Sequence, residues 1–439
     1  MEIWALVMFV VAISALLIGY PVAFTLGATA LLFGTVALGF DYFYLLPLRI
    51  WGILTNFTLL AVPLFVFMGV VLEKSGLAEE LLETMAMLCG RMRGGLAFAV
   101  IIVGALLAAT TGVVGATVVT MGVIALPAML KHGYSPSLAT GTIASAGTLG
   151  QVIPPSIVLI LLADVVGVPI GSLFLAAVVP GSILIALYTG YIAIKAWQDP
   201  KSAPAIVSFD QQPIILRVVK SLFPPLFLIT AVLGSIFFGV ASPTESAAIG
   251  STGALILAAF RRRLSRDTLQ LATLQTMKLT SMVFIILIGA TAFGLVFKGM
   301  GGDRLVHDIF IAMPGGHISF LLVGQAVIFI LGFFLDFVEI CFIVVPILTP
   351  IASALGLDML WFALLIAINL QTSFLTPPFG FSLFYLKAVA PKSIKIQQIY
   401  RGIVPFVILQ LATLTLVATF PELIRWLPDM MDRIHGIPP

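Results

Sequence analysis

Two polar segments interrupt apolar stretches of this chain, and each contains a pair of adjacent prolines. The first spans residues 147–156 and the second spans residues 370–380, so that Pro154 and Pro377 stand 223 residues apart. If each stretch is a helix inside a membrane, the break leaves backbone N–H and C=O groups that hydrocarbon cannot satisfy. Such breaks persist only where protein, ions or water fill the gap, so two breaks in matching places predict a binding site.

Each break should offer oxygen ligands to a cation and a helix N-terminus to an anion. In the first break we expect one helix to end near Gly147 and the next to begin at Pro154 or Pro155, because proline suits the first turn of a helix. Released carbonyls and the hydroxyls of Thr148 and Ser156 would form a set of oxygens suited to a small cation. The new N-terminus carries about half a positive charge, which suits an anionic group.

The second break repeats this chemistry with more polar side chains. They precede Pro377 and are Gln371, Thr372, Ser373 and Thr376. An alternative is that both breaks are proline kinks whose threonines bond back to their own helix. That alternative does not explain why the breaks are duplicated.

Two further interrupted segments, residues 96–130 and 318–351, should form helical hairpins whose tips abut the breaks. The first tip is almost uncharged, whereas the second offers Asp336 and Glu339. An acidic side chain at the bilayer centre costs roughly 3 kcal/mol, which favours a role in ion or substrate binding. The alternative is that a carboxylate lies at an aqueous rim or pairs structurally.

The composition predicts a polytopic membrane protein. Hydrophobic residues make up 61% of the chain and charged residues 9%, against about 45–50% and 25% in soluble domains. The histidines and the two cysteines show no metal-ligand spacing, and no phosphate-binding GxxxxGK[ST] motif occurs. We therefore expect no enzyme, no cofactor and no nucleic-acid partner.

The offset of 223 recurs outside the breaks, for example between Gly76 and Gly299. It predicts two homologous halves, 1–197 and 221–439, joined by a polar linker, 198–220. The first half would hold scaffold spans 1–73, an arm 77–93, the hairpin 96–130 and a broken span 137–165. The second would hold scaffold spans 222–297, an arm 303–313, the hairpin 318–351 and a broken span 359–389.

The predicted fold is all-α, with about five spans and one re-entrant hairpin in each half. An odd number of crossings inverts the second half relative to the first. Placing both termini in the periplasm puts most lysines and arginines on the cytoplasmic side, as the positive-inside rule expects.

Several segments resemble the large membrane subunit of tripartite ATP-independent periplasmic (TRAP) transporters. They are Gly19–Ala23, Gly133–Tyr134, Gly147–Ser156, Ser242–Ala248, Leu335–Asp336, Pro346–Pro350 and Thr376–Gly380. The stretch Asn369–Phe374 resembles the branch named for mannitol and chloroaromatic compounds. Many members have a serine-rich first tip, whereas this chain has Thr111-Gly112-Val113-Val114, so ion ligation there would use backbone carbonyls and Thr110 or Thr111.

The resemblance implies an elevator-type sodium symporter in the bacterial inner membrane that imports a small organic acid, such as a C4-dicarboxylate, a 2-oxo acid or lactate. A small four-helix membrane subunit and a periplasmic binding protein would be its partners. The alternatives are an autonomous sodium- or proton-coupled anion symporter and, from another class, a passive channel or scaffold.

The resemblance also implies residue roles. Sodium-site roles fall on Thr111, Gly112, Val113, Gly147, Thr148, Pro154, Asp336, Thr372, Thr376 and Pro377. The polar or proline residues beside them are candidates for the substrate site: Gln151, Pro155, Ser156, Glu339, Gln371, Ser373 and Pro378.

Overall fold

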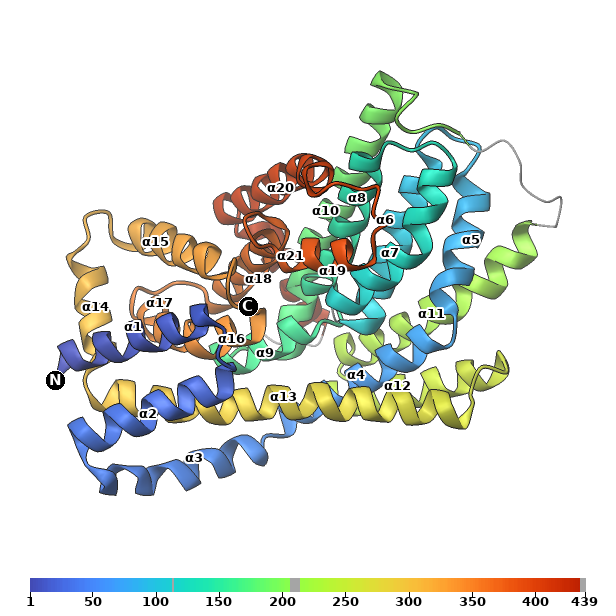
Figure 1. Ribbon diagram of the computed structural model, residues 1–439. Helices are drawn as coiled ribbons and strands as arrows, with labels where there is room; N and C mark the ends of the chain where they lie inside the picture. Colours follow the sequence, from blue (N-terminus) through green and yellow to red (C-terminus); the bar gives the residue numbers. More distant parts are fainter. Residues whose placement is uncertain (113, 206–213, 435–439) are drawn as a thin grey trace.

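The computed structural model describes residues 1–112, 114–205 and 214–434, and every regular element in these ranges is a helix (Figure 1). Six of the helices are long and apolar enough to cross a membrane. The expected all-α, polytopic fold is therefore confirmed. Further apolar helices are shorter, and the pair α16–α17 is bent by 50° at its junction.

The helices up to residue 198 follow one another in chain order. They are α1 (Glu2–Ile18), α2 (Val22–Leu38), η1 (Phe40–Tyr44), α3 (Leu45–Leu54), η2 (Phe57–Leu60), α4 (Ala61–Lys74), α5 (Leu77–Cys89), α6 (Gly95–Thr111), α7 (Val114–Lys131), α8 (Pro136–Thr148), η3 (Leu149–Gln151), α9 (Ile157–Val166) and α10 (Ile170–Gln198).

The second half repeats the pattern of an arm, a hairpin, a broken helix and a long span. Its helices are α11 (Ile214–Phe237), α12 (Pro243–Phe260), α13 (Arg266–Gly299), α14 (Gly302–Ala312), α15 (Gly316–Leu331), α16 (Phe337–Ile343), α17 (Val345–Ala354), α18 (Met359–Leu375), α19 (Phe381–Val389), α20 (Ile396–Thr419) and α21 (Glu422–Ile434).

Three features of the helices differ from the sequence-based expectation. The sequence predicts that the third scaffold span of the second half begins at residue 277. Helix α13 instead begins at Arg266, because the side chain of Ser265 caps it by accepting a hydrogen bond from the Thr268 N–H. Helix α11 begins at Ile214, inside the segment assigned to the linker. Helices α3 and α21 were not expected, since neither is long enough to show as a span.

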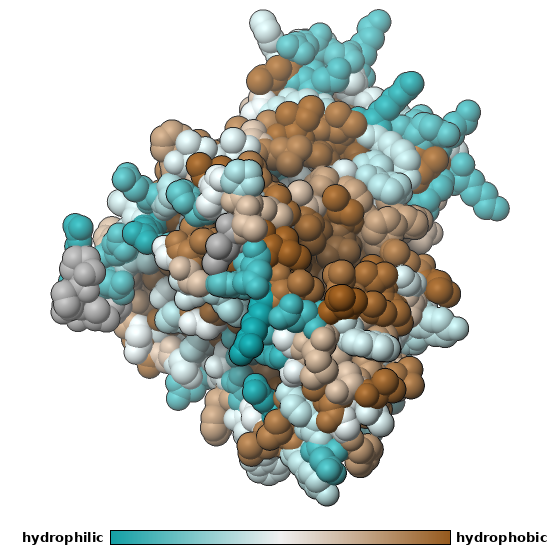
Figure 2. Space-filling view, turned by 90° about the vertical axis from the view of Figure 1, so that its left-hand side faces the viewer, coloured by the Kyte–Doolittle hydropathy of each residue, from teal (hydrophilic) through white to brown (hydrophobic). Residues whose placement is uncertain are grey.

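The helices form a flat layer and a bundle. Helix α13 packs along α2 and α4, and α12 packs along α4, so these helices form a layer across the lower part of Figure 1. Helix α8 packs against α6, α7 and α20 in the bundle above this layer. On the face seen in Figure 2, hydrophobic side chains cover broad areas and hydrophilic ones gather toward the upper edge, as expected for a surface in contact with lipid.

Two glycines bring α8 and α20 into backbone contact. A Cβ atom at Gly141 would overlap the carbonyl oxygen of Gly402, and a Cβ at Gly402 would overlap the carbonyl oxygen of Ser137. Small residues at such a crossing let two helix backbones approach closely, which is how helices associate without a hydrophobic driving force in lipid.

The last helix, α21, packs on α10 and is tied to the start of α18. Ile424, Pro428 and Met431 are its buried residues. Arg425 forms an ion pair with Asp358, and Asp358 also caps α18 by accepting hydrogen bonds from the N–H groups of Leu360 and Trp361 at 2.8 and 3.2 Å. The Asp358 carboxylate therefore caps α18 and also binds α21.

Replacing Asp358 should separate these two roles. We expect Asp358→Ala to lower the free energy of unfolding by about 1–2 kcal/mol, because the N-cap of α18 is lost. Asp358→Asn keeps the cap and loses only the partly exposed ion pair, so it should cost about 0–1 kcal/mol. Thermal unfolding of the detergent-solubilised protein measures both. Equal destabilisation by the two variants would contradict the capping role.

Candidate functional site

Both predicted breaks are present, and the prolines lie in the non-helical connections. Helix α8 ends at Thr148 and α9 begins at Ile157, while α18 ends at Leu375 and α19 begins at Phe381. The expectation that the prolines open the second helices is wrong. A residue that precedes proline is disfavoured in the helical conformation, so a Pro-Pro pair delays the helix start until both residues have passed.

The two breaks share their backbone conformation but differ in exposure. The peptide bonds Pro154–Pro155 and Pro377–Pro378 are both cis. Pro154 and Pro155 are buried, whereas Pro377 is half-buried and Pro378 is exposed. The carbonyl of Pro378 accepts a hydrogen bond from the Tyr400 hydroxyl at 3.2 Å. The second break is therefore the more accessible of the two.

The hydroxyl groups in the breaks donate to nearby backbone carbonyls. In the first break, Thr148 donates to the carbonyl of Ser145 at 2.9 Å and Ser156 donates to that of Gln151 at 3.0 Å. The second break has the same arrangement at Thr372, Ser373 and Thr376, over 2.8, 2.9 and 2.7 Å. Because each proton is engaged, each oxygen keeps its lone pairs for a further donor or a cation.

Two glutamines in or beside the breaks are fully buried with unpaired amides. Gln151 lies in η3 and Gln371 lies one turn before the end of α18. Among the residues that the structure describes, neither the nitrogen nor the oxygen of either amide has a hydrogen-bond partner. A buried polar group without a partner costs roughly 1–3 kcal/mol. The unpaired amide in each break is therefore available to bind a polar ligand, an ion or water.

The first hairpin tip touches the first broken helix. Helix α6 ends at Gly112, whose φ of 59° lies in the left-handed region, and a Cβ placed there would be 3.1 Å from Cγ1 of Ile157. Gly147 packs just as closely, because a Cβ there would overlap Val118 on α7. The side chain of Thr111 and the whole of Val113 lie outside the described residues.

The second hairpin tip touches the second broken helix and carries both predicted carboxylates. A Cβ at Gly332 would overlap the Ser373 hydroxyl, and the ring of Phe337 lies 6.3 Å from that of Phe374. Asp336 and Glu339 cap α16: Asp336 Oδ1 accepts from the Phe337 N–H at 2.6 Å, and Glu339 Oε2 accepts from the Asp336 N–H at 3.1 Å. Both side chains are half-buried. Helix capping thus engages one oxygen of each carboxylate.

One cavity of about 640 Å³ lies between both tips, the helices that flank the two breaks, and the layer helices α4 and α13. Val114 of the first tip, Ile157 of the first broken helix, Asp336 of the second tip and Phe374 of the second broken helix all line it. Among the described lining residues, Asp336 is the one that the sequence predicted. Most of the other predicted side chains are buried and do not line the cavity: Thr148, Gln151, Ser156, Gln371, Thr372 and Ser373.

The sequence analysis missed several polar residues that line this cavity. Lys74 and Glu73 lie on α4, while Gln275 and Lys278 lie on α13; Tyr385 of α19 completes this set. Lys278 gave no functional signal, because the sequence placed it at the cytoplasmic end of its predicted span, where cations are expected.

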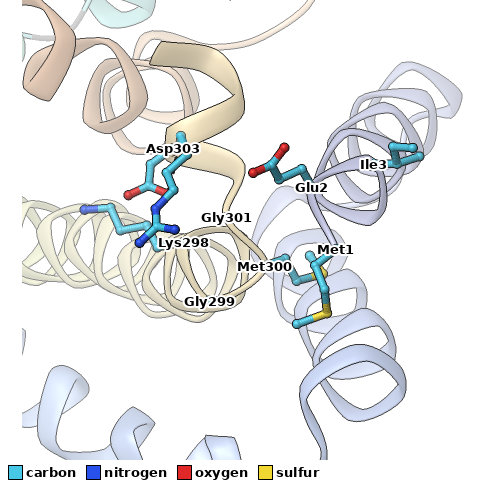
Figure 3. Close-up of a pocket in the computed structure, with 9 residues that line it drawn as sticks. Met1, Glu2, Ile3, Lys298, Gly299, Met300, Gly301 and Asp303 are labelled. Carbon is cyan, nitrogen blue, oxygen red and sulfur yellow. Dashed lines mark hydrogen bonds between the residues drawn. The ribbon is translucent and has the colours of Figure 1, made fainter. Parts of the chain in front are cut away.

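Two other cavities lie at the far end of α13. One of about 520 Å³ separates the N-terminus from the turn between α13 and α14, where Glu2 faces Asp303 and Lys298 (Figure 3). The other, of about 480 Å³, is lined by Arg49, Asp164 and Lys298. Neither is lined by a predicted site residue, so the cavity that contains Asp336 is the candidate site.

Residues 8–423 match the family described as "Tripartite ATP-independent periplasmic transporter, DctM component". The chain is 29% identical to the C4-dicarboxylate TRAP transporter large permease protein DctM of Vibrio cholerae, over 97% of both chains. It is 31% identical to the protein of that name from Pseudomonas aeruginosa, over 88% of this chain and 90% of the relative. The sialic acid TRAP transporter large permease protein SiaM of Vibrio cholerae is 29% identical, over 95% and 97%.

Two solved structures share the fold. The YdaH transporter of Alcanivorax borkumensis superposes with a TM-score of 0.63 at 15% identity, covering 88% of this chain and 89% of YdaH. MtrF of Neisseria gonorrhoeae superposes with a TM-score of 0.53 at 13% identity, covering 89% and 85%. The protein is thus a multi-pass membrane transporter subunit rather than an enzyme, and it belongs to the DctM component family of the tripartite ATP-independent periplasmic transporters.

Proposed function

We propose that this chain is the large permease of a sodium-coupled symporter that imports a small organic acid across the bacterial inner membrane. A small four-helix membrane subunit and a periplasmic binding protein would complete the assembly. The convergence of both tips, and of the helices that flank both breaks, on one cavity carries the proposal. Relatives named for C4-dicarboxylates and sialic acid support the class of substrate, since both are carboxylic acids. The resemblance to the mannitol and chloroaromatic branch stays a prediction.

The oxygens of the breaks support sodium as the coupling ion. Unwound backbone in broken helices supplies carbonyls to Na⁺ in transporters of this kind, and the hydroxyls of Thr148, Thr372 and Thr376 add lone pairs. Two cation sites are proposed, one at each break. The first is formed by Thr111, Gly112, Val113, Gly147, Thr148 and Pro154, and the second by Asp336, Thr372, Thr376 and Pro377.

The two unpaired amides support a substrate site between the breaks. Gln151 and Gln371 are neutral donors and acceptors that suit the carboxylate and hydroxyl groups of an organic acid. Their proposed neighbours in this site are Pro155, Ser156, Glu339, Ser373 and Pro378. Cations bound at both breaks would hold the unwound segments in place, so that the substrate's pocket is preorganised only when the ions are loaded.

The arms support an elevator movement of the bundle against the layer. Arm α5 is tied to α11 by the ion pair of Arg217 with Glu83, at 2.6 Å, and to the end of the layer helix α12 by that of Arg261 with Glu80. Glycines with positive φ stand at both ends of each arm: Gly76 and Gly94 around α5, and Gly301 and Gly315 around α14. We propose that these glycines are the hinges of the movement, and that both termini are periplasmic.

Uptake by the reconstituted assembly tests the proposed function. Proteoliposomes carrying both membrane subunits receive labelled succinate, pyruvate or lactate with an inward sodium gradient. Accumulation that needs both sodium and the binding protein is the expected result. Accumulation without the binding protein would favour an autonomous symporter, and downhill flux without sodium dependence would indicate a channel.

Removing one hydroxyl should weaken the proposed second cation site without disturbing the fold. Thr376→Val keeps the shape of the side chain but loses an oxygen, so we expect the sodium concentration for half-maximal uptake to rise about tenfold. Thr376→Ser restores the oxygen and serves as the matched control. A sodium dependence in Thr376→Val equal to that of the unmodified protein would remove Thr376 from the site.

A further inference from the structure

The candidate site cavity has a cationic side chain on its layer wall. The residues of α13 that line the cavity recur at helical spacing and so share one face: Gln275, Lys278, Leu279, Met282 and Val283. Within the described part of α13, Lys278 is the one cation on this face. It lies twelve residues beyond Arg266, where the helix begins, which is about 18 Å along the axis. Lys278 therefore lines the cavity away from the end of the helix, and its side chain is exposed, so that an entering ligand can reach it.

The charge of Lys278 is not neutralised by a neighbour. Among the described residues it has neither an ion pair nor a hydrogen bond, whereas Lys74 on α4 pairs with Glu73 at 3.0 Å. Asp336 lines the same cavity, but its hydrogen bond goes to the Phe337 N–H. Most other lining side chains are apolar, for example Val66, Val119 and Leu279, so Lys278 is the one unpaired cation among the described residues that line the cavity.

We propose that Lys278 binds the carboxylate of the substrate at a second anion site, on the layer wall and apart from the breaks. This inference rests on the proposed import of an organic acid. A carboxylate that leaves the breaks must otherwise cross an apolar cavity, where an unpaired charge is costly. The ammonium group of lysine is a strongly hydrated point charge on a flexible stem, so it can receive the anion and then release it to water.

The arginines at the start of α13 extend this path. Arg263 precedes α13 and Arg266 is its first residue, on the side that the charge distribution assigns to the cytoplasm, whereas Arg261 is paired with Glu80. A substrate anion would pass from the breaks to Lys278 and then toward this positive rim. The Lys278 site would therefore bind the anion during its release, whereas the breaks would determine which substrate is bound.

Transport by three variants tests this assignment. We expect Lys278→Gln to slow sodium-driven uptake of succinate, pyruvate or lactate about tenfold, with the sodium dependence unchanged. Lys278→Arg should keep most of the rate, because the charge remains. Lys131→Gln, which removes an exposed cation at the end of α7 outside the cavity, should leave the rate unchanged. An unchanged rate in Lys278→Gln would overturn the proposal.

A chemical readout separates failure of this inference from failure of the proposed function. Cys89 and Cys341 are replaced and Met282→Cys is introduced in the cavity wall of the purified assembly. The thiol is then modified with an anionic sulfonatoethyl or a cationic trimethylammonioethyl methanethiosulfonate. With Lys278 present, the anionic reagent should be favoured several-fold and succinate should slow it; Lys278→Gln should abolish both effects.

The same reagent preference with and without Lys278 would show that the lysine extends toward lipid headgroups and does not bind anions in the cavity. If the unmodified assembly carries none of the three acids, the proposed function fails. The ratio of the two reagents still decides whether the cavity attracts anions, since it does not depend on transport.

Discussion

Asp336→Asn is expected to abolish sodium-driven uptake while leaving the fold intact. Asparagine is as good an N-cap as aspartate, so the hydrogen bond to the Phe337 N–H and the start of α16 are retained. What is lost is the single negative charge that the second tip presents to the cavity. Removing one partner of a buried charge pair costs about 3–5 kcal/mol, which is on the order of 100-fold or more in cation affinity.

Comparison with Asp336→Ala separates charge from capping. The alanine variant loses both, so we expect it to lose uptake and also about 1 kcal/mol of stability. Uptake against sodium concentration and thermal unfolding with and without sodium measure the two effects. Sodium should raise the unfolding temperature of the unmodified protein but not that of Asp336→Asn. Uptake by Asp336→Asn within twofold of the unmodified rate would exclude the carboxylate from the ion site.

A side chain at Gly141 is expected to prevent α8 and α20 from packing. The atoms that a Cβ would meet belong to the backbone of Gly402, so they cannot rotate away as a side chain would. Overpacking in a well-packed interior typically costs about 1–3 kcal/mol, and we place Gly141→Ala at or above the top of this range. Gly402→Ala should behave in the same way, because it meets the backbone of Ser137.

Gly190→Ala is the matched control. Gly190 lies inside α10, and a Cβ there has no atom within 4 Å. The helix propensity of alanine should therefore make this variant slightly more stable, by up to about 1 kcal/mol. Size-exclusion profiles and unfolding temperatures in detergent compare the three variants. An unfolding temperature of Gly141→Ala equal to that of Gly190→Ala would contradict the close crossing.

The breaks were predictable because their cause is local. Proline lacks an N–H wherever it stands, so a Pro-Pro pair interrupts a helix for a reason that the sequence shows directly. The 223-residue offset between the two pairs also recurs between other residues, which makes coincidence a poor explanation. The helix starts after the breaks were placed too early, since the restriction on the residue before proline was not applied to Pro154 and Pro377. That restriction is also local, so this error was avoidable from the sequence.

The cavity wall was not predictable in the same way. Which face of α13 meets the cavity depends on how α13 packs along α2 and α4, and no local pattern encodes that packing. The capping roles of Asp336 and Glu339 were nevertheless visible, because an acidic residue three positions after another is the pattern of a capping box. The full burial of Gln151 and Gln371 required the assembled fold.

The C-terminal helix, α21, has a charged surface that keeps it at the membrane–water interface. Five of its thirteen residues carry charge, namely Glu422, Arg425, Asp429, Asp432 and Arg433. Each would cost roughly 3 kcal/mol at the centre of a bilayer. Arg425 of α21 pairs with Asp358, the residue directly before α18. Any movement of α18 toward the bilayer centre therefore pulls the charged surface of α21 toward the lipid. Helix α21 therefore limits how far the second broken helix can move toward the bilayer centre, because α21 itself cannot enter the lipid.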